Sequence, residues 1–200
     1  MLQMINKTIV WDVDDVLNDL TKEWFNREWL IKHPDCNIIY DELFHNPPHL
    51  LLNISIEEYL QSLDDFRMSH GHNLNPLKEV YNWFKQYGHL YRNIVLTSTP
   101  LFYASFSAQW VFLNYGSWIC SYNFIPSPRK DSIPFEYFSR KSDFLSWLGK
   151  VDLYIDDNEI NVFNAQAENI NSVLFPRPWN RSSSTISQFL EKLVSDYLIK

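Results

Sequence analysis

Cysteine is scarce in this chain of 200 residues, which contains only Cys36 and Cys120. Neither residue lies in a metal-ligand spacing or in the pattern of a disulfide framework. We therefore expect two free thiols in a reducing compartment. A basic segment followed by an apolar one is also absent ahead of Asp12, so no secretion signal is visible and we expect a cytoplasmic protein.

Positive charge is in deficit as well. The sequence has 17 Lys and Arg residues against 24 Asp and Glu residues, which gives a formal net charge of -7. Because nucleic-acid polymers are bound mainly through basic surfaces, we do not expect such a partner. A small anionic substrate stays compatible with this balance, since a bound metal ion reverses the local sign of the charge.

No apolar run in the sequence predicts a membrane span. The segment 101–125 carries no charged residue, but Ser, Asn and Gln recur through it. Such a polar content disfavours a transmembrane helix. A buried helix followed by a strand explains the segment better, and we expect no membrane partner.

Strand-like and helix-like segments alternate along the chain, which is typical of a parallel sheet with helices on its faces. Hydrophobic residues make up 46% of the sequence and can fill the core of such a domain. Apolar runs predict strands at 8–11, 93–96, 119–125, 151–155 and 172–175. The sequence therefore predicts an α/β fold with a Rossmann-like parallel sheet.

The segment between the first two predicted strands is too long for a single crossover helix. Ser55, followed by Glu58 three residues later, is the capping-box pattern of a helix start within this segment. We therefore expect a helical insertion over residues 18–90. The sheet domain is then formed by residues 1–17 and 91–200.

Two pairs of carboxylates follow strand-like runs. Asp12 and Asp14 come directly after the run 8–11, and Asp156-Asp157 ends another run near the far end of the chain. Ligands of such sheets bind beyond the carboxyl ends of the strands, so we expect both pairs at one site. Carboxylates packed so closely repel one another unless a cation or shared protons hold them. An oxygen-ligated divalent ion, most often Mg²⁺, is the expected companion.

Four motifs in a fixed order extend this interpretation. They are Asp12-x-Asp14, the pair Thr97-Ser98, Lys141 at the start of a predicted helix, and Asp156-Asp157. Together they resemble the four ordered motifs of the haloacid dehalogenase-like (HAD) phosphohydrolases, over most of the chain. The resemblance implies a HAD-like α/β core with a small helical cap inserted after the first strand. It also implies a small phosphorylated metabolite as the substrate.

The resemblance implies different roles for the four carboxylates. Asp12 would attack phosphorus and form an aspartyl-phosphate. The side chain of Asp14 would protonate the leaving oxygen and then take a proton from the attacking water. Mg²⁺ would be bound by Asp12, the main-chain carbonyl of Asp14 and Asp157, with Asp156 close by.

The remaining two motifs would bind the substrate phosphate. Thr97 or Ser98 would donate a hydroxyl, although the segment that contains them is also compatible with a simple turn. Lys141 would supply positive charge at a helix start. It fits best because it precedes the second acidic pair by one helix and a turn, and Lys130 is the alternative.

The residue after the first acidic pair departs from the HAD pattern. Asp15 stands where glycine is common in the family. Asp tolerates the left-handed backbone conformation, so the turn can still form. Taken alone, Asp14-Asp15 is also compatible with the N-cap of a helix.

A finer resemblance is to the 5'(3')-deoxyribonucleotidase branch. It rests on Leu96-Thr97-Ser98, on Arg140-Lys141, and on segment 175–180, which looks like the Arg-Pro-aromatic-Asn stretch of that branch. The same segment is also compatible with a rigid proline loop that packs Trp179.

The sequence therefore predicts a Mg²⁺-dependent phosphomonoesterase, with a deoxynucleoside monophosphate as one candidate substrate. A HAD phosphatase for another small ester, such as a sugar phosphate, is the first alternative. A non-catalytic HAD-fold protein that binds a phosphorylated ligand or a protein partner is the second. The sequence does not indicate an oligomeric state.

Overall fold

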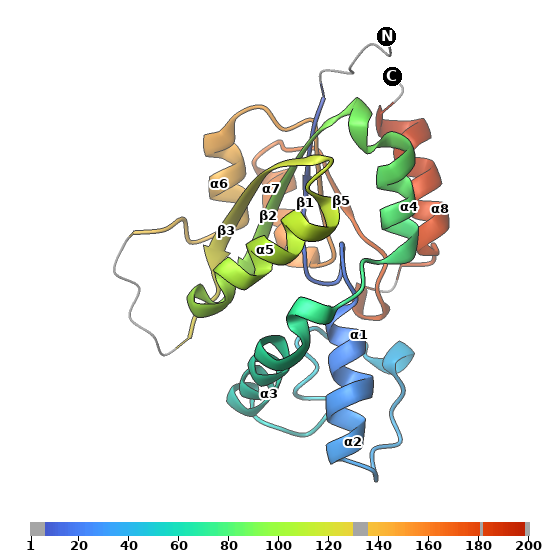
Figure 1. Cartoon of the computed structure of the whole chain (residues 1–200), viewed down its shortest axis with the longest axis vertical. Coiled ribbons are helices and arrows are strands. Elements are labelled where there is room, and N and C mark those ends of the chain that lie inside the picture. Colours follow the sequence, from blue (N-terminus) through green and yellow to red (C-terminus); the bar gives the residue numbers. More distant parts are fainter. Residues whose placement is uncertain (1–6, 130–135, 181, 199–200) are drawn as a thin grey trace.

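The computed structural model describes residues 7–129, 136–180 and 182–198. The fold is α/β, as predicted, and is built on a five-stranded parallel sheet in the order β3-β2-β1-β4-β5 (Figure 1). The strands are β1 (Thr8–Trp11), β2 (Arg92–Thr99), β3 (Ile119–Pro126), β4 (Leu153–Asp156) and β5 (Ser172–Leu174). Because β1 lies at the centre, the residues that follow it are flanked by the ends of β2 and β4.

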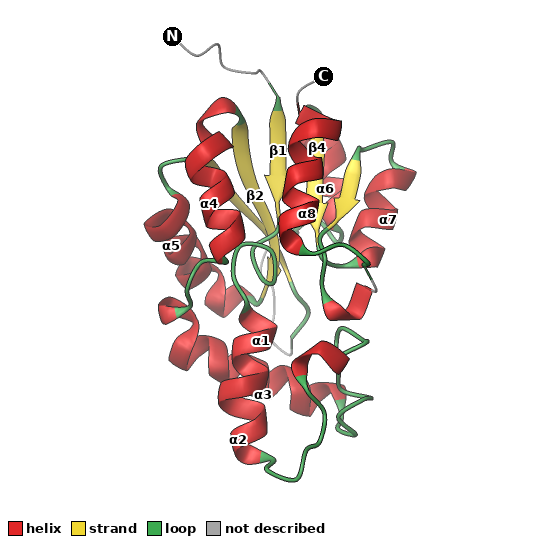
Figure 2. Cartoon of the chain, turned by 90° about the vertical axis from the view of Figure 1, so that its right-hand side faces the viewer, coloured by secondary structure: helices red, strands yellow, loops and turns green. Residues whose placement is uncertain are grey.

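Helices cover both faces of the sheet and also form a separate layer beyond its strand ends (Figure 2). Those of the sheet domain are α4 (Lys78–Tyr87), α5 (Ala104–Tyr115), α6 (Lys141–Leu148), α7 (Glu159–Ala167) and α8 (Ile186–Lys192). Those of the separate layer are α1 (Leu20–Trp24), α2 (Leu30–Lys32) and α3 (Ile56–His70). No helix in the described part of the chain combines the length and the apolar character needed to cross a membrane.

The side chains of β1 alternate between two hydrophobic cores, as expected for a buried strand. Ile9 and Trp11 belong to the core under α4, α5 and α8, whereas Val10 belongs to the core under α6 and α7. Trp11 contacts α4 closely, with its ring centroid 4.9 Å from that of Phe84 and 5.1 Å from that of Trp83. The residue before the first acidic pair is therefore fixed by aromatic packing.

The separate helical layer is held together by its own aromatic residues. Residues Phe25–Trp29 are π-helical and connect α1 to α2, so that 20–32 form one helical run. The ring of Trp24 packs edge-on against that of Tyr59 of α3 at 5.2 Å, and its Nε1 donates to Ser62 Oγ at 3.0 Å. Ser55 caps α3 as predicted, since its hydroxyl accepts a hydrogen bond from the backbone N–H of Glu58.

The chain enters and leaves this layer at neighbouring points. An antiparallel bridge joins Asn18 to Pro76, and the N–H of Leu77 donates to the carbonyl of Leu17 at 2.9 Å. Helix α4, which follows, packs on the sheet rather than on α1 and α3. We therefore propose that the inserted cap spans about 19–75, a shorter range than the 18–90 expected from the sequence.

Two other expectations concern the segment that follows α4. β2 continues through Thr99, and Thr97 and Ser98 pair with Phe124 and Ile125 of β3, so these residues form a strand end and not a simple turn. The uncharged segment 101–125 forms α5 and most of β3, so the expected helix and strand are present. The helix is buried on one side only, since Phe106, Phe112 and Leu113 are exposed.

The aromatic contact between α4 and β1 yields a stability prediction. Phe84 is fully buried, so Phe84→Ala should lower the free energy of unfolding by about 3–5 kcal/mol, through lost burial and the cavity left behind. Phe163→Ala is the matched control, because that ring is 69% exposed on α7 and its loss should change stability by less than about 0.5 kcal/mol. Urea denaturation measures both, and equal losses would contradict the packing described.

Candidate active site

Asp12 lies at the centre of the strand-end edge. Its backbone N–H donates to the carbonyl of Ile155 on β4 at 3.0 Å, which extends the sheet by one residue. Its carboxylate is oriented by two donors, the N–H of Val13 at 2.7 Å and Nζ of Lys141 at 2.6 Å. The side chain is 7% exposed, so this carboxylate is both buried and fixed in direction.

Asp156 ends β4 and holds Lys141 from the other side. The Nζ of Lys141, the first residue of α6, lies 2.8 Å from Asp156 Oδ2. Further donors to the same carboxylate are the hydroxyl of Tyr154, the N–H of Asn158 at 2.8 Å and Nδ2 of Asn161 at 3.2 Å. Both oxygens of Asp156 are therefore occupied, and its role in this arrangement is to position Lys141.

The site holds more negative than positive charge. Asp12, Asp156 and Asp157 each place a carboxylate oxygen within 4.8 Å of the others, and all three are buried. Burial raises the pKa of Asp12 to about 7, although the attraction of Lys141 opposes the shift. Burial and the neighbouring carboxylates raise the pKa of Asp157 well above its usual range. Burial opposes the charge on Lys141, but Asp12 and Asp156 outweigh it and raise the ammonium pKa. One ammonium thus faces three carboxylates.

This donor set fits a hard divalent cation. Clustered carboxylate oxygens without sulfur or imidazole are the ligands that Mg²⁺ prefers. Asp12 and Asp157 are the carboxylates best placed to hold it, because they accept from two donors and one donor, respectively, whereas Asp156 accepts from four. The side chain of Asp14 is not a member of the carboxylate cluster, which leaves its main-chain carbonyl as the ligand implied by the sequence.

A cavity of about 150 Å³ opens above these carboxylates, between the strand ends and the cap, and we call it the strand-end cavity. Among the residues that line it are Asp12, Asp14, Thr97, Ser98, Lys141 and Asp157. The structure therefore brings all but one of the expected site residues to one cavity. The exception, Asp156, lies directly behind Lys141. The alternative lysine, Lys130, lies outside the described residues.

Asp14 points toward the cap, and sequence reasoning missed its partner. Its Oδ2 lies 3.0 Å from Nη2 of Arg67, on α3, and its Oδ1 accepts a hydrogen bond from Asn18 at 3.2 Å. Tyr59 and Leu63 of the same helix also line the strand-end cavity. No spacing in the sequence relates Arg67 to the acidic pairs, since the contact depends on how the cap packs on the sheet domain.

The loop after Asp14 is held in a left-handed turn by buried polar contacts. Asp15 has a φ of 62°, in keeping with the expectation that it adopts this conformation. Its carboxylate accepts hydrogen bonds from the N–H and the hydroxyl of Thr21. Burial raises the pKa of Asp15 to about 6, although Arg177 opposes the shift. Asp15 thus has a structural role.

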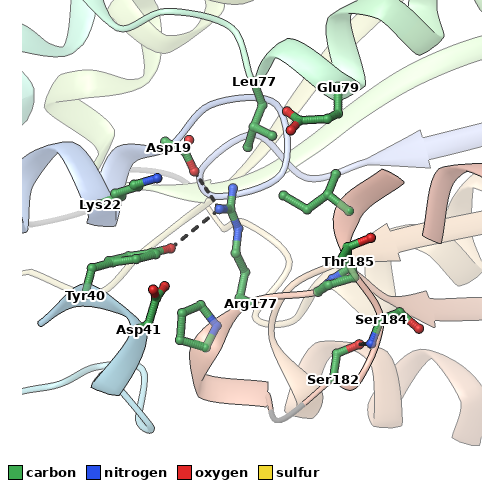
Figure 3. Close-up of a pocket in the computed structure, with 13 residues that line it drawn as sticks. Asp19, Lys22, Tyr40, Asp41, Leu77, Glu79, Arg177, Ser182, Ser184 and Thr185 are labelled. Carbon is green, nitrogen blue, oxygen red and sulfur yellow. Dashed lines mark hydrogen bonds and ion pairs between the residues drawn. The ribbon is translucent and has the colours of Figure 1, made fainter. Parts of the chain in front are cut away.

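Arg177 fixes the same loop from the far end of the chain. Its guanidinium donates to the backbone carbonyls of Asp15 and Asn18, at 2.5 and 3.1 Å. It also pairs with the carboxylate of Asp19 (Figure 3). The hydroxyl of Tyr40 lies 3.5 Å from Nη1, and both residues line a second pocket, separate from the strand-end cavity (Figure 3). Because a guanidinium is always charged and has several donors, it can bind these acceptors at once.

The rest of segment 175–180 supports Asp157. Trp179 is buried, and its Nε1 donates to Asp157 Oδ2 at 2.9 Å. Asn180 Nδ2 donates to the carbonyl of Asp157 at 3.0 Å. The expected packing of Trp179 in a proline loop is therefore present, and the loop also orients one of the three clustered carboxylates.

Comparisons with known proteins identify the fold that carries this site. No protein-family model and no curated protein matches the chain. Solved structures similar to it include a haloacid dehalogenase-like family hydrolase from Streptococcus pneumoniae, with a TM-score of 0.58 and 13% identity over 84% of either chain. Another similar structure is that of a protein from Lactobacillus delbrueckii subsp. bulgaricus, described as a phosphoglycolate phosphatase by similarity. Its TM-score is 0.60, with 13% identity over 98% of this chain and 100% of that one.

A third similar structure is Protein Tyrosine Kinase A of Mycobacterium tuberculosis, with a TM-score of 0.60 and 13% identity over 90% of this chain and 91% of that one. At these identities the likeness concerns the fold alone. The chain thus has the Rossmann-like fold of the HAD-like hydrolases, which confirms the expected fold class.

The buried charge balance of the site generates a second stability prediction. Lys141→Gln removes the ammonium that faces Asp12 and Asp156, and should lower the free energy of unfolding by about 3–5 kcal/mol because two buried carboxylates lose their partner. Lys150→Gln, at an exposed lysine after the same helix, should have little effect. Urea denaturation in metal-free buffer compares the two variants. A loss no larger for Lys141→Gln than for Lys150→Gln would contradict the described role of Lys141.

Proposed function

We propose that the chain is a Mg²⁺-dependent phosphomonoesterase that works through an aspartyl-phosphate at Asp12. The observation that carries the proposal is the buried pairing of Lys141 with Asp12 and Asp156 at the strand-end cavity. Such a pairing presents a directed carboxylate beside a fixed positive charge. Both free thiols, Cys36 and Cys120, support a reducing compartment such as the cytoplasm.

The proposed reaction has two steps. In the first, a carboxylate oxygen of Asp12 forms a bond to phosphorus as the ester P–O bond breaks, and Asp14 gives its proton to the leaving oxygen. In the second, water attacks phosphorus, Asp14 takes its proton, and the bond to Asp12 breaks to release phosphate. Lys141, Thr97 and Ser98 line the cavity, and we infer that the ammonium and the two hydroxyls would bind the phosphoryl oxygens.

The proposed metal site serves the same reaction. Asp12, Asp157 and the carbonyl of Asp14 would hold Mg²⁺, with Asp156 behind them on Lys141. When bound, the ion reduces the repulsion between the carboxylates and an incoming phosphate. The HAD-like fold of the chain, shared with solved hydrolases, supports this assignment.

The strand-end cavity favours a small substrate over a nucleotide. Pockets for drug-sized ligands usually measure about 300–1,000 Å³, and this cavity measures about 150 Å³. A phosphate with a short tail matches that space better than a phosphate with a sugar and a base. Deoxyribonucleotidase activity thus stays a prediction from the sequence, and the alternative of another small phosphate ester becomes our preferred form of the proposal.

The nucleophile can be tested directly. Asp12→Asn should reduce the hydrolysis of p-nitrophenyl phosphate in the presence of Mg²⁺ by about 10³-fold or more, because the amide is a poor nucleophile. Asp143→Asn is the control, since that carboxylate lies on the outer side of α6 and pairs with Arg140. Mass spectrometry of the quenched wild-type reaction should locate the phosphoryl group on Asp12. Equal activity of wild type and Asp12→Asn would remove Asp12 from the mechanism.

Metal binding can be tested without turnover. Mg²⁺ at about 100 times its dissociation constant should stabilise the fold by about 2.7 kcal/mol, which corresponds to a rise in Tm of roughly 5–10 °C for a chain of this size. Asp157→Asn should abolish the rise while keeping an oxygen that can accept from Trp179. Asp65→Asn, on the exposed side of α3, should leave it intact. An undiminished rise in Asp157→Asn would exclude the proposed ligand.

A further inference from the structure

Arg67 reaches the strand-end cavity from the cap, and its hydrogen-bonding capacity is not fully used. The residue is 7% exposed and lines the cavity. Nη2 pairs with Asp14 at 3.0 Å and Nη1 with Asp64 at 2.8 Å. Its buried Nε has no hydrogen-bond partner among the described residues. A buried donor without a partner is costly, so a ligand that accepts from this group would be favoured.

The partner that Arg67 finds on its own helix is already shared. Asp64 receives both Nε and Nη2 of Arg129, at 2.6 and 3.0 Å, from the loop after β3. Arg129 therefore takes much of the negative charge of Asp64. The charge of Arg67 is balanced mainly across the cavity, by Asp14. A guanidinium in this position can bind a carboxylate through two parallel hydrogen bonds.

The location of Arg67 relative to Asp14 indicates which part of a substrate it meets. In the proposed function, the phosphoryl group lies against Asp12 and Lys141, which contact each other at 2.6 Å, and Asp14 faces the leaving oxygen. Arg67 is paired with Asp14, so it lies on the leaving-group side of the cavity. It would therefore contact the group attached to the leaving oxygen rather than the phosphoryl oxygens.

We propose that the substrate is the phosphate monoester of a small hydroxy acid, and that Arg67 determines specificity by binding its carboxylate. This inference rests on the proposed function. The cavity of about 150 Å³ holds the volume of roughly five waters, so a phosphate with a tail of a few atoms would fill it. Binding would exchange one carboxylate partner of Arg67 for another. The exchange would release Oδ2 of Asp14, which would take up a proton from solvent water and then give it to the leaving oxygen.

Two substrates that differ only in the anionic group test the inference. 2-Phosphoglycolate and 2-hydroxyethyl phosphate have the same length, but the first ends in a carboxylate and the second in a hydroxymethyl group. Wild-type protein with Mg²⁺ should hydrolyse the first with a kcat/KM about 10- to 100-fold higher, as expected for hydrogen bonds to a charged group. A ratio near one, with both esters hydrolysed, would overturn the inference and leave the proposed function intact.

Variants then assign the preference to Arg67. In Arg67→Gln the ratio of kcat/KM between the two esters should fall to near one. In Arg67→Lys the ratio should be intermediate, because lysine keeps the positive charge but lacks the two parallel donors of a guanidinium. Arg129→Gln is the control. It removes the ion pair between Arg129 and Asp64, and because Arg129 does not line the strand-end cavity, the wild-type ratio should be kept. An equal loss on both esters in Arg67→Gln, with the ratio preserved, would overturn the assignment.

A binding measurement separates the inference from the proposed chemistry. Calorimetry with Asp12→Asn protein and Mg²⁺ should show tighter binding of 2-phosphoglycolate than of 2-hydroxyethyl phosphate, again by about 10- to 100-fold. The difference should disappear when Arg67→Gln is added. If neither ester nor p-nitrophenyl phosphate is hydrolysed by the wild type, the proposed function fails, and the binding ratio alone supports or overturns the role of Arg67.

Discussion

The interaction on which the site depends is the buried ammonium of Lys141 between Asp12 and Asp156. Three carboxylates meet where the centre of a parallel sheet ends, and in a poorly solvated position their repulsion opposes folding. Lys141 offsets part of that repulsion. Tyr154, Asn158 and Asn161 hold Asp156 so that Lys141 has one position. The charge that remains is what makes a divalent cation a natural ligand.

The supporting residues come from distant parts of the sequence. Arg177 and Trp179, both from the loop after β5, hold the loop that follows β1 and the carboxylate of Asp157. Asp12 is held from behind by the packing of Trp11 on α4. The groups proposed to react are therefore oriented by rigid neighbours, which is the arrangement that lets electrostatic stabilisation act without reorganisation.

The sequence predicted the parts of the fold that depend on local pattern. Apolar strand runs and the cap of α3 at Ser55 could be predicted, because period and capping are local properties. The acidic pairs could also be placed at one edge, since parallel strands end on the same side. The proposed end of the cap could not be predicted, because α4 looks like any amphipathic helix. Its assignment to the sheet depends on the contacts of Trp83 and Phe84 with Trp11.

The same limit applies to Arg67, whose contact with Asp14 is set by how two helical layers meet. An arginine on a helix surface has no sequence signal that distinguishes it from a solvated one. Asp156 is a related case. Its place beside Asp157 suggested a metal carboxylate, whereas its surroundings give it hydrogen-bond donors on both oxygens.

The bridge between Asn18 and Pro76 has an evolutionary consequence. Because the cap leaves and rejoins the sheet domain at one point, it can lengthen, shorten or be replaced without changing the strand order. The residues proposed to perform the chemistry and the residue proposed to select the substrate thus occupy separate stretches of sequence. Each stretch can accumulate substitutions largely independently of the other, so a chain of this design can acquire a new substrate while its reaction stays the same.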